Sequence, residues 1–271
     1  MTPISSLQNQ HIKQIRALRN RKERDSSGLF YIDTAQLVAA AADHGAHIEL
    51  LVVVPEQLRS PFCRGLAHRL RAAVPTIEVT AEVFGGLAGR DDTQGLGAVV
   101  RQRWTALDRL EDADDRCRVA LDGVQYPGNL GTILRTCDAV GAAGVVLLGP
   151  TADPYDPAAA RASTGAIFTQ QLVRASPGQL AAWARGRGAT VVGTAPEARL
   201  DYRAADYRAP LVLAMGSEGH GLSADMRAAC DTLVRIPMVG AADSLNLAIA
   251  ASLMLYEAFR QAQPPAAARA V

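Results

Sequence analysis

Apolar and polar stretches alternate along the first hundred residues with the lengths of short strands and helices. A loosely helical period runs over 7–22, and helical stretches follow at 35–42 and 62–73. Apolar runs that predict strands occupy 30–32, 48–54, 76–80 and 95–102. Strands that alternate with helices predict a small α/β domain in this part of the chain.

From residue 117 the apolar runs become longer. Strands are predicted at 118–124, 144–149, 189–194, 210–216 and 232–238, with helices between them and a long closing helix at 243–260. The runs are nearly continuous in Val, Leu and Ala, which is typical of a parallel sheet covered by helices on both faces. The pattern therefore predicts a second, larger α/β domain.

The composition changes between these two parts. Residues 108–116, DRLEDADDR, hold five acidic and two basic residues and almost no apolar period. We therefore predict domains at 1–104 and 118–262, a linker at 105–117 and a disordered tail at 263–271. The alternative interpretation of the acidic stretch is a solvated helix within one continuous domain.

Positive charge is concentrated near the N-terminus, although the formal net charge of the chain is only +1. Against the single acid Glu23, the first 24 residues hold six basic ones, which we predict to bind nucleic acid: Lys13, Arg16, Arg19, Arg21, Lys22 and Arg24. Arginine, which dominates the basic residues of this chain, is the better fork for phosphate and the better stacking partner for bases.

The remaining composition narrows the class of protein. The four cysteines are scattered without zinc or redox spacing, so we expect no metal site and a reducing compartment. The N-terminal stretch has no apolar signal-peptide core, and no apolar run has the length of a bilayer span. We therefore expect a soluble, cytoplasmic protein with no membrane partner.

Three segments marked by glycine or proline follow predicted strands of the second domain. They are DGVQYPGNLGTILR (122–135), MGSEGHGL (215–222) and IPMVGAADSLNLAIA (236–250). In an open parallel sheet, ligands bind beyond the carboxyl ends of the strands, so these segments are candidates for one site. Taken singly, each also has a structural interpretation, as a glycine turn, a helix cap or a surface arginine.

Known nucleotide fingerprints do not match these segments. The chain has no G-x-G-x-x-G after a strand and no P-loop, and GSEGHG is not a nucleophile elbow. His220 has no second histidine near it in this half of the chain, which favours a polar loop residue over a metal ligand.

In their order and spacing, the three segments resemble the three motifs of the SpoU (TrmH-like) RNA ribose 2′-O-methyltransferases of the SPOUT superfamily. The resemblance covers about 122–260. The opening SLQNQHIKQIRALRNRKER resembles, more weakly, the ribosomal-protein-like RNA-binding domain of many such enzymes. One departure is Asp33-Thr34, where many relatives have Glu-Gly, and it concerns RNA docking rather than chemistry.

The resemblance implies properties that composition does not reach. It implies a C-terminal SPOUT domain with a deep trefoil knot, a homodimer with composite sites, and S-adenosylmethionine as cofactor. By motif position, the cofactor-binding residues are Gly216, Ile236, Leu245, Thr194, Met238 and Ser244.

The resemblance also assigns catalytic residues, namely Arg135, Asn129, Glu218, Ser244 and Asn246. Arg135 is the principal one, and we favour a phosphate clamp over a general base because a guanidinium stays protonated. The implied function is 2′-O-methylation of a ribose in RNA, with 23S ribosomal RNA as the leading substrate and antibiotic resistance as a further role. The alternatives are a tRNA ribose methyltransferase, a non-catalytic RNA-binding relative, and an unrelated nucleotide-dependent α/β enzyme.

Overall fold

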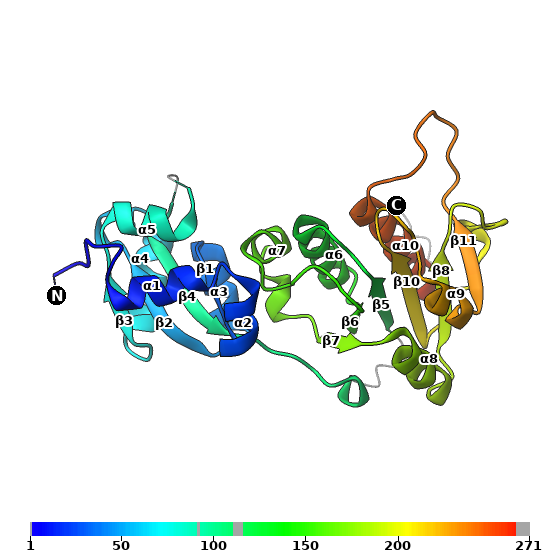
Figure 1. Ribbon diagram of the computed structural model, residues 1–271, viewed down its shortest axis with the longest axis horizontal. Coiled ribbons are helices and arrows are strands. Elements are labelled where there is room, and N and C mark those ends of the chain that lie inside the picture. The colour runs from blue at the N-terminus through cyan, green and yellow to red at the C-terminus, as the bar shows by residue number, and fades with distance from the viewer. Residues whose placement is uncertain (1, 91–92, 111–115, 264–271) are drawn as a thin grey trace, which may run out of the picture. The chain divides into compact units, whose positions relative to one another are not determined.

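The computed structural model describes residues 2–90, 93–110 and 116–263. Two compact units divide it (Figure 1). The first unit contains residues 1–103 and 153–169, and the second contains 104–152 and 170–271. The first unit thus includes an excursion of the chain, 153–169, that the sequence assigned to the larger domain. No helix in the described ranges has the length and apolar character needed to cross a membrane.

A four-stranded sheet with the order β1-β4-β2-β3 forms the centre of the first unit. Its strands are β1 (Leu29–Ile32), β2 (Ile48–Val53), β3 (Thr76–Glu78) and β4 (Leu96–Arg101). Only the pairing of β2 with β3 is parallel. The helices of this unit are α1 (Gln10–Ala17), α2 (Arg21–Ser27), α3 (Ala35–Asp43), α4 (Pro61–Arg71), α5 (Ala81–Ala88) and α7 (Pro157–Ser163). The small α/β domain predicted for this part of the chain is confirmed.

Two helices replace the single helical period at 7–22. The helix α1 ends at Ala17, and α2 begins after Asn20, whose side chain accepts a hydrogen bond from the Lys22 N–H and caps the new helix. The apolar residues of the period still share one buried face, because Ile12, Ile15 and Leu18 all lie in the core beside α5. The period therefore identified the buried face correctly but not the break between helices.

Arg24 lies inside the first unit and is 2% exposed. Its Nε donates to Asp153 Oδ2 at 2.7 Å, and its Nη1 donates to the carbonyls of Leu18 and Arg19 at 2.9 and 2.8 Å. An exposed RNA-binding role for Arg24 therefore does not fit this structure, since the guanidinium is fully engaged in joining the 153–169 segment to the break between the helices. The other five predicted RNA-binding residues are exposed.

The second unit is built on a seven-stranded sheet with the order β7-β6-β5-β10-β8-β11-β9, and every strand pair in it is parallel. The strands are β5 (Cys117–Asp122), β6 (Gly144–Leu148), β7 (Leu172–Ala175), β8 (Thr190–Thr194), β9 (Leu200–Asp201), β10 (Leu211–Gly216) and β11 (Thr232–Arg235). The predicted parallel sheet is confirmed. The short strands β7 and β9 were not predicted, because four or two residues carry too little pattern.

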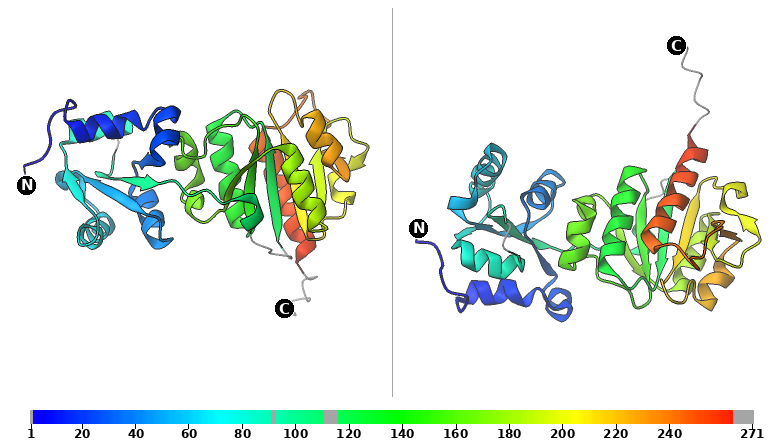
Figure 2. Two further views of the ribbon diagram at one scale, coloured as in Figure 1. Left: turned by 60° about the horizontal axis from the view of Figure 1, so that its bottom comes forward. Right: turned by 90° about the horizontal axis from the view of Figure 1, so that it is seen from above.

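Helices cover both faces of this sheet (Figure 2). On one face, α6 (Pro127–Ala139) packs against α10 (Leu247–Ala262). On the other, α8 (Pro177–Gly186) packs against α9 (Ala224–Ala229), and Leu180, Trp183 and Met226 join the sheet core there. The long closing helix begins at Leu247 and not at residue 243, because Asn246 accepts hydrogen bonds from the Ala248 and Ile249 N–H groups as its N-cap. This leaves 236–246 as an irregular segment next to the sheet edge.

The predicted linker lies partly outside the described residues, which exclude 111–115, and the predicted tail does so from residue 264 onward. The described part of the linker contains a 3₁₀ turn, Leu107–Arg109, and Leu110 is 1% exposed in the core of the second unit. Leu110 is therefore not part of a solvated linker, since its side chain packs in that core.

Candidate active site at the carboxyl edge of the parallel sheet

Neighbouring strands bring the three sequence segments to one sheet edge. In the register of the parallel pair β5 and β10, Asp122 lies opposite Gly216. The strand β8, which ends at Thr194, is the other neighbour of β10, and β11 follows next to it. Because the strands are parallel, the segments 122–135, 215–222 and 236–250 all leave the sheet at the same edge, as the sequence predicted.

Gly216 lies where the two ends of the 216–222 loop come into close backbone contact. A Cβ atom at this position would lie 2.0 Å from the carbonyl carbon of Gly221 and 2.1 Å from the amide nitrogen of Leu222. The loop closes through two hydrogen bonds, each 3.0 Å long, between the main chains of Ser217 and Gly221. The glycine of this motif therefore permits contact between two backbone segments and is more than a turn residue.

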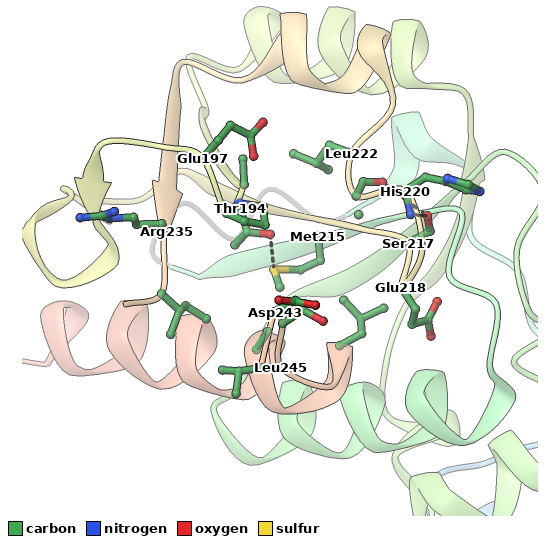
Figure 3. A pocket seen from close by; sticks show the side chains of 18 of the residues that line it. Thr194, Glu197, Met215, Ser217, Glu218, His220, Leu222, Arg235, Asp243 and Leu245 are labelled. Atoms are coloured by element: carbon green, nitrogen blue, oxygen red, sulfur yellow. Dashed lines mark hydrogen bonds between the residues drawn. The ribbon is translucent and has the colours of Figure 1, made fainter. Parts of the chain in front are cut away.

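A cavity of about 460 Å³ opens beside this loop (Figure 3). Its walls include every residue that the resemblance assigned to the cofactor: Gly216, Ile236, Leu245, Thr194, Met238 and Ser244. Sequence reasoning missed its apolar floor, to which Met215, Leu222 and Leu247 contribute buried side chains. These three residues read in the sequence as ordinary core positions, so their contact with a cavity had no sequence signal.

Three carboxylates border the cavity, those of Glu197, Glu218 and Asp243 (Figure 3). Glu197 forms an ion pair with Arg227, another cavity residue. Hydrogen bonds from its own main chain and from Arg227 lower the pKa of Glu197, so this carboxylate is negative near neutral pH. The cavity therefore combines an apolar floor with charged groups of both signs at its border, since Arg227 and Arg235 also line it.

A chain of hydrogen bonds joins the three segments next to the cavity. Asn129 Nδ2 donates to Glu218 Oε1 at 2.8 Å. Asn246 Nδ2 donates to Asn129 Oδ1 at 3.0 Å, and the Asn246 Oδ1 atom caps α10. Three of the five predicted catalytic residues, one from each segment, thus form a single connected group.

The direction of this chain is fixed at both ends. An ionised carboxylate only accepts hydrogen bonds and main-chain N–H groups only donate them, so Glu218 requires the Nδ2 of Asn129 and the helix requires the Oδ1 of Asn246. Each amide uses its oxygen and one of its two Nδ2 hydrogens within the chain. Among the described residues, each therefore keeps one N–H with which to donate to an oxygen of a bound molecule.

Glu218 is held as an anion. Burial alone raises the pKa of its carboxyl. Hydrogen bonds from the Asn129 amide and from the main-chain N–H groups of Gln125 and Tyr126 lower this pKa by more than burial raises it, so the net pKa falls below the ordinary value. The Gln125 N–H donates to Glu218 Oε2 at 3.0 Å. Glu218 is thus a weak base near neutral pH and braces the amide of Asn129.

Arg135 and Ser244 stand apart from this chain. Arg135 lies on an exposed position of α6, six residues after Asn129, which at 100° per residue places it about 120° away around the helix. Ser244 borders the cavity from the irregular segment. The structure therefore brings Asn129, Glu218 and Asn246 together, places Ser244 near the cofactor cavity, and leaves Arg135 on the surface.

Asp122 is a further site residue that the sequence analysis did not assign. Its carboxylate is 9% exposed, and Oδ2 accepts a hydrogen bond of 2.7 Å from the N–H of Ser223, the N-cap of α9. Asp122 thereby ties the end of β5 to the chain that leaves the glycine loop. A polar residue at the end of an apolar strand, next to Gly123, was the available signal.

The sequence and this geometry agree with matches to known families. A model of the SpoU rRNA Methylase family matches residues 116–256. A model of the MRM3-like substrate binding domain matches residues 9–98. The chain belongs to the SpoU rRNA methylase family.

Individual relatives match between 70% and 96% of the chain. A 23S rRNA (uridine(2479)-2′-O)-methyltransferase of Streptomyces viridochromogenes is 35% identical over 251 residues, which cover 90% of this chain and 87% of that protein. A 23S rRNA (guanosine-2′-O-)-methyltransferase of Ralstonia nicotianae is 38% identical over 70% of this chain and 78% of that protein. The crystal structure of an AdoMet-bound rRNA methyltransferase from Sinorhizobium meliloti, 38% identical, superposes with a TM-score of 0.88 and covers 96% of this chain and 97% of its own.

Proposed function

We propose that the protein transfers a methyl group from S-adenosylmethionine to a ribose 2′-hydroxyl of 23S ribosomal RNA, with S-adenosylhomocysteine leaving and the hydroxyl proton passing to solvent. The observation that carries the proposal is the Glu218–Asn129–Asn246 chain, which presents amide donors beside the cavity. The relatives named for 2′-O-methylation of 23S rRNA support the choice of acceptor and substrate.

The cavity suits S-adenosylmethionine. Its volume lies within the range of about 300–1,000 Å³ typical of small-molecule sites, and Met215, Leu222 and Leu247 give it an apolar floor. The carboxylate of Asp243 complements the positive ammonium and sulfonium groups of this ligand, and Arg235 complements its carboxylate, whereas Glu197 is already paired with Arg227. Gly216, Ile236 and Leu245 would hold this ligand, which supplies an electrophilic methyl group when bound.

The residues next to the cavity would orient the acceptor. The remaining Nδ2 hydrogens of Asn129 and Asn246 suit ribose or phosphate oxygens, and Glu218 fixes the amide of Asn129 without taking a proton itself. Arg135 would clamp the phosphate of the target nucleotide, since its guanidinium remains charged and forks to two phosphate oxygens. Holding a 2′-oxygen in line with the methyl group lowers the barrier by several kcal/mol, at best about 7–11 kcal/mol.

We propose that the protein acts as a homodimer in which Arg135 approaches the site of the partner subunit. The helix α10 exposes Ile249, Leu253 and Tyr256, which follow one another at helical spacing along one side. An apolar stripe of this kind indicates a protein interface. Because α6 packs against α10, the exposed Arg135 lies on a helix adjoining this stripe. Light scattering of a Leu253→Glu variant, which should be monomeric and inactive, tests this arrangement.

The deep trefoil knot is proposed on the strength of the family. The path of the last elements supports it, because the chain leaves β11 near one edge of the sheet and returns as α10 to pack on β5 and β10 at its centre. Cytoplasmic location and a role in antibiotic resistance stay predictions.

We propose that α1 and α2 contribute to RNA binding through Lys13, Arg16 and Lys22, which are exposed, together with Arg19 and Arg21. Arg19 is partly committed, since its Nη2 donates to the Gly86 and Leu87 carbonyls, and Arg21 pairs with Asp25. Replacing Lys13, Arg16 and Lys22 by Gln should reduce the dependence of log Kd on log salt by about 0.7–0.9 for each phosphate that these residues neutralise. An unchanged slope would remove these residues from the RNA surface.

One experiment decides the main proposal. Unmodified 23S rRNA transcript and a tRNA pool are incubated separately with the protein and tritiated S-adenosylmethionine, and 2′-O-methylated positions are then mapped. Label in a single ribose of the 23S transcript supports the proposal. Label in tRNA alone would establish the tRNA alternative, and RNA binding without label would establish the non-catalytic one.

A further inference from the structure

Tyr126 carries an exposed aromatic ring beside the candidate active site. Its side chain is 63% exposed, although the described aromatic residues are mostly buried or half-buried. Phe62 and Tyr256 are the other exposed aromatic residues in the described ranges, and Tyr256 belongs to the apolar stripe of α10. Burial does not account for the ring of Tyr126.

The backbone next to Tyr126 is anchored to the catalytic group. The main-chain N–H of Gln125, the preceding residue, donates to Glu218 Oε2 at 3.0 Å. Tyr126 is the N-cap residue of α6, but its side chain makes no capping hydrogen bond. The following Pro127 restricts Tyr126 to the extended backbone that it adopts, with φ −98° and ψ 118°. The ring therefore projects from a fixed point three residues before Asn129.

We propose that the ring of Tyr126 stacks on an RNA base at or next to the nucleotide whose ribose is methylated. This inference rests on the proposed function. A ribose held by Asn129 must carry a base into the space around α6, and RNA bases outside a helix are recognised by stacking on aromatic side chains. Stacking one base on such a ring changes affinity by about 5- to 150-fold. Tyr126 is thus an RNA-contacting residue that sets affinity and is not required for the methyl-transfer step itself.

Steady-state methylation of the 23S rRNA transcript by Y126A, Y126F and the control T132A, an exposed position of the same helix, tests the proposal. Y126A should raise the KM for RNA by about 5- to 150-fold, with a smaller change in kcat and an unchanged calorimetric Kd for S-adenosylmethionine. Y126F, which keeps the ring, and T132A should remain within about twofold of the wild type. A KM for Y126A within twofold of the wild type, or equal losses in Y126A and Y126F, would overturn the proposal.

A second measurement does not depend on turnover. The indole of Y126W should be quenched when the 23S rRNA transcript is added, beyond the quenching of Trp104 and Trp183 in the wild type. Absence of additional quenching would overturn stacking at this position. If the wild type transfers no methyl group to any RNA, the proposed function fails, and the quenching still decides whether Tyr126 contacts RNA.

Discussion

The amide of Asn129 lies between the other two members of the hydrogen-bonded group, so Asn129→Ala is the most informative perturbation. The substitution removes a 2.8 Å bond to the Glu218 carboxylate and a 3.0 Å bond from Asn246. It also removes the Nδ2 hydrogen that we propose donates to the acceptor nucleotide. The side chain of Asn129 is only half-buried, so water replaces part of these interactions.

The magnitude follows from these hydrogen bonds. A hydrogen bond to a charged group contributes about 1.5–3 kcal/mol, and a neutral one about 0.5–1.5 kcal/mol. Loss of one charge-assisted bond in the transition state corresponds to a rate loss of about 10- to 150-fold. The free energy of unfolding should fall by only about 1 kcal/mol, because Glu218 keeps its bond to the Gln125 N–H.

Single-turnover methyl transfer with saturating cofactor and RNA measures this effect, and calorimetry should show an unchanged Kd for S-adenosylmethionine. Thr132→Ala is the matched control, since Thr132 is an exposed residue of the same helix whose hydroxyl donates to the Gly128 carbonyl of that helix. Turnover of Asn129→Ala within twofold of the wild type would refute the role assigned to the hydrogen-bonded group.

Asn129→Asp separates geometry from charge. It keeps the volume but places a second carboxylate next to Glu218, and a like charge raises the pKa of such a pair. The residual activity should therefore rise as pH falls, because a proton shared between the two carboxyls restores a donor. An activity that is independent of pH, or that rises with pH, would contradict the short distance between these side chains.

The remaining predictions concern the surface arginine, the cavity, the buried ion pair and the pH dependence. Arg135→Ala should abolish methyl transfer in a single-turnover assay and leave cofactor affinity unchanged; wild-type turnover would exclude both clamp and base. Leu245→Arg should eliminate calorimetric binding of S-adenosylmethionine by placing a charge in the cavity, and unchanged affinity would remove Leu245 from the site. Arg24→Ala should lower the free energy of unfolding in urea by about 3–5 kcal/mol, because Asp153 is left buried and unpaired; a decrease below about 1 kcal/mol would show that the pair is dispensable. The folded-state pKa of Glu218 is lowered, so its stabilising effect is present above its ordinary pKa and is lost as pH falls through the folded value; Glu218→Gln should therefore destabilise at pH 7 and less at pH 3, and an equal effect at both would contradict this.

Much of the fold was determined by local pattern. The runs at 144–149 and 210–216 each form the predicted strand, since a buried parallel strand needs an apolar residue at nearly every position. The ends of helices and strands were harder to predict from the sequence. Asp243, Ser244 and Asn246 all have side chains suited to an N-cap, so the sequence did not decide between them. In the structure Asn246 caps the closing helix, which therefore starts at Leu247.

For the candidate site too, some features were predicted from the sequence and others were shown only by the structure. The resemblance of three segments to the motifs of the family pointed to Asn129, Glu218 and Asn246, whose side chains the structure joins by hydrogen bonds. The structure showed that Arg135 lies away from this group, on an exposed position of α6. It also decided the pairing of β5 with β10, which are far apart in the sequence and meet only through the order of strands.

Arg24 gives the physical reason for this division. By sequence it is one of six basic residues near the N-terminus, and nothing local distinguishes it from Arg21 or Lys22. In the structure it is buried and forms an ion pair with Asp153, a residue 129 positions away. Side-chain type and periodicity determine which residues can be buried, charged or capping, because those properties are local. Which partner each residue meets depends on long-range packing, and only the tertiary structure decided that.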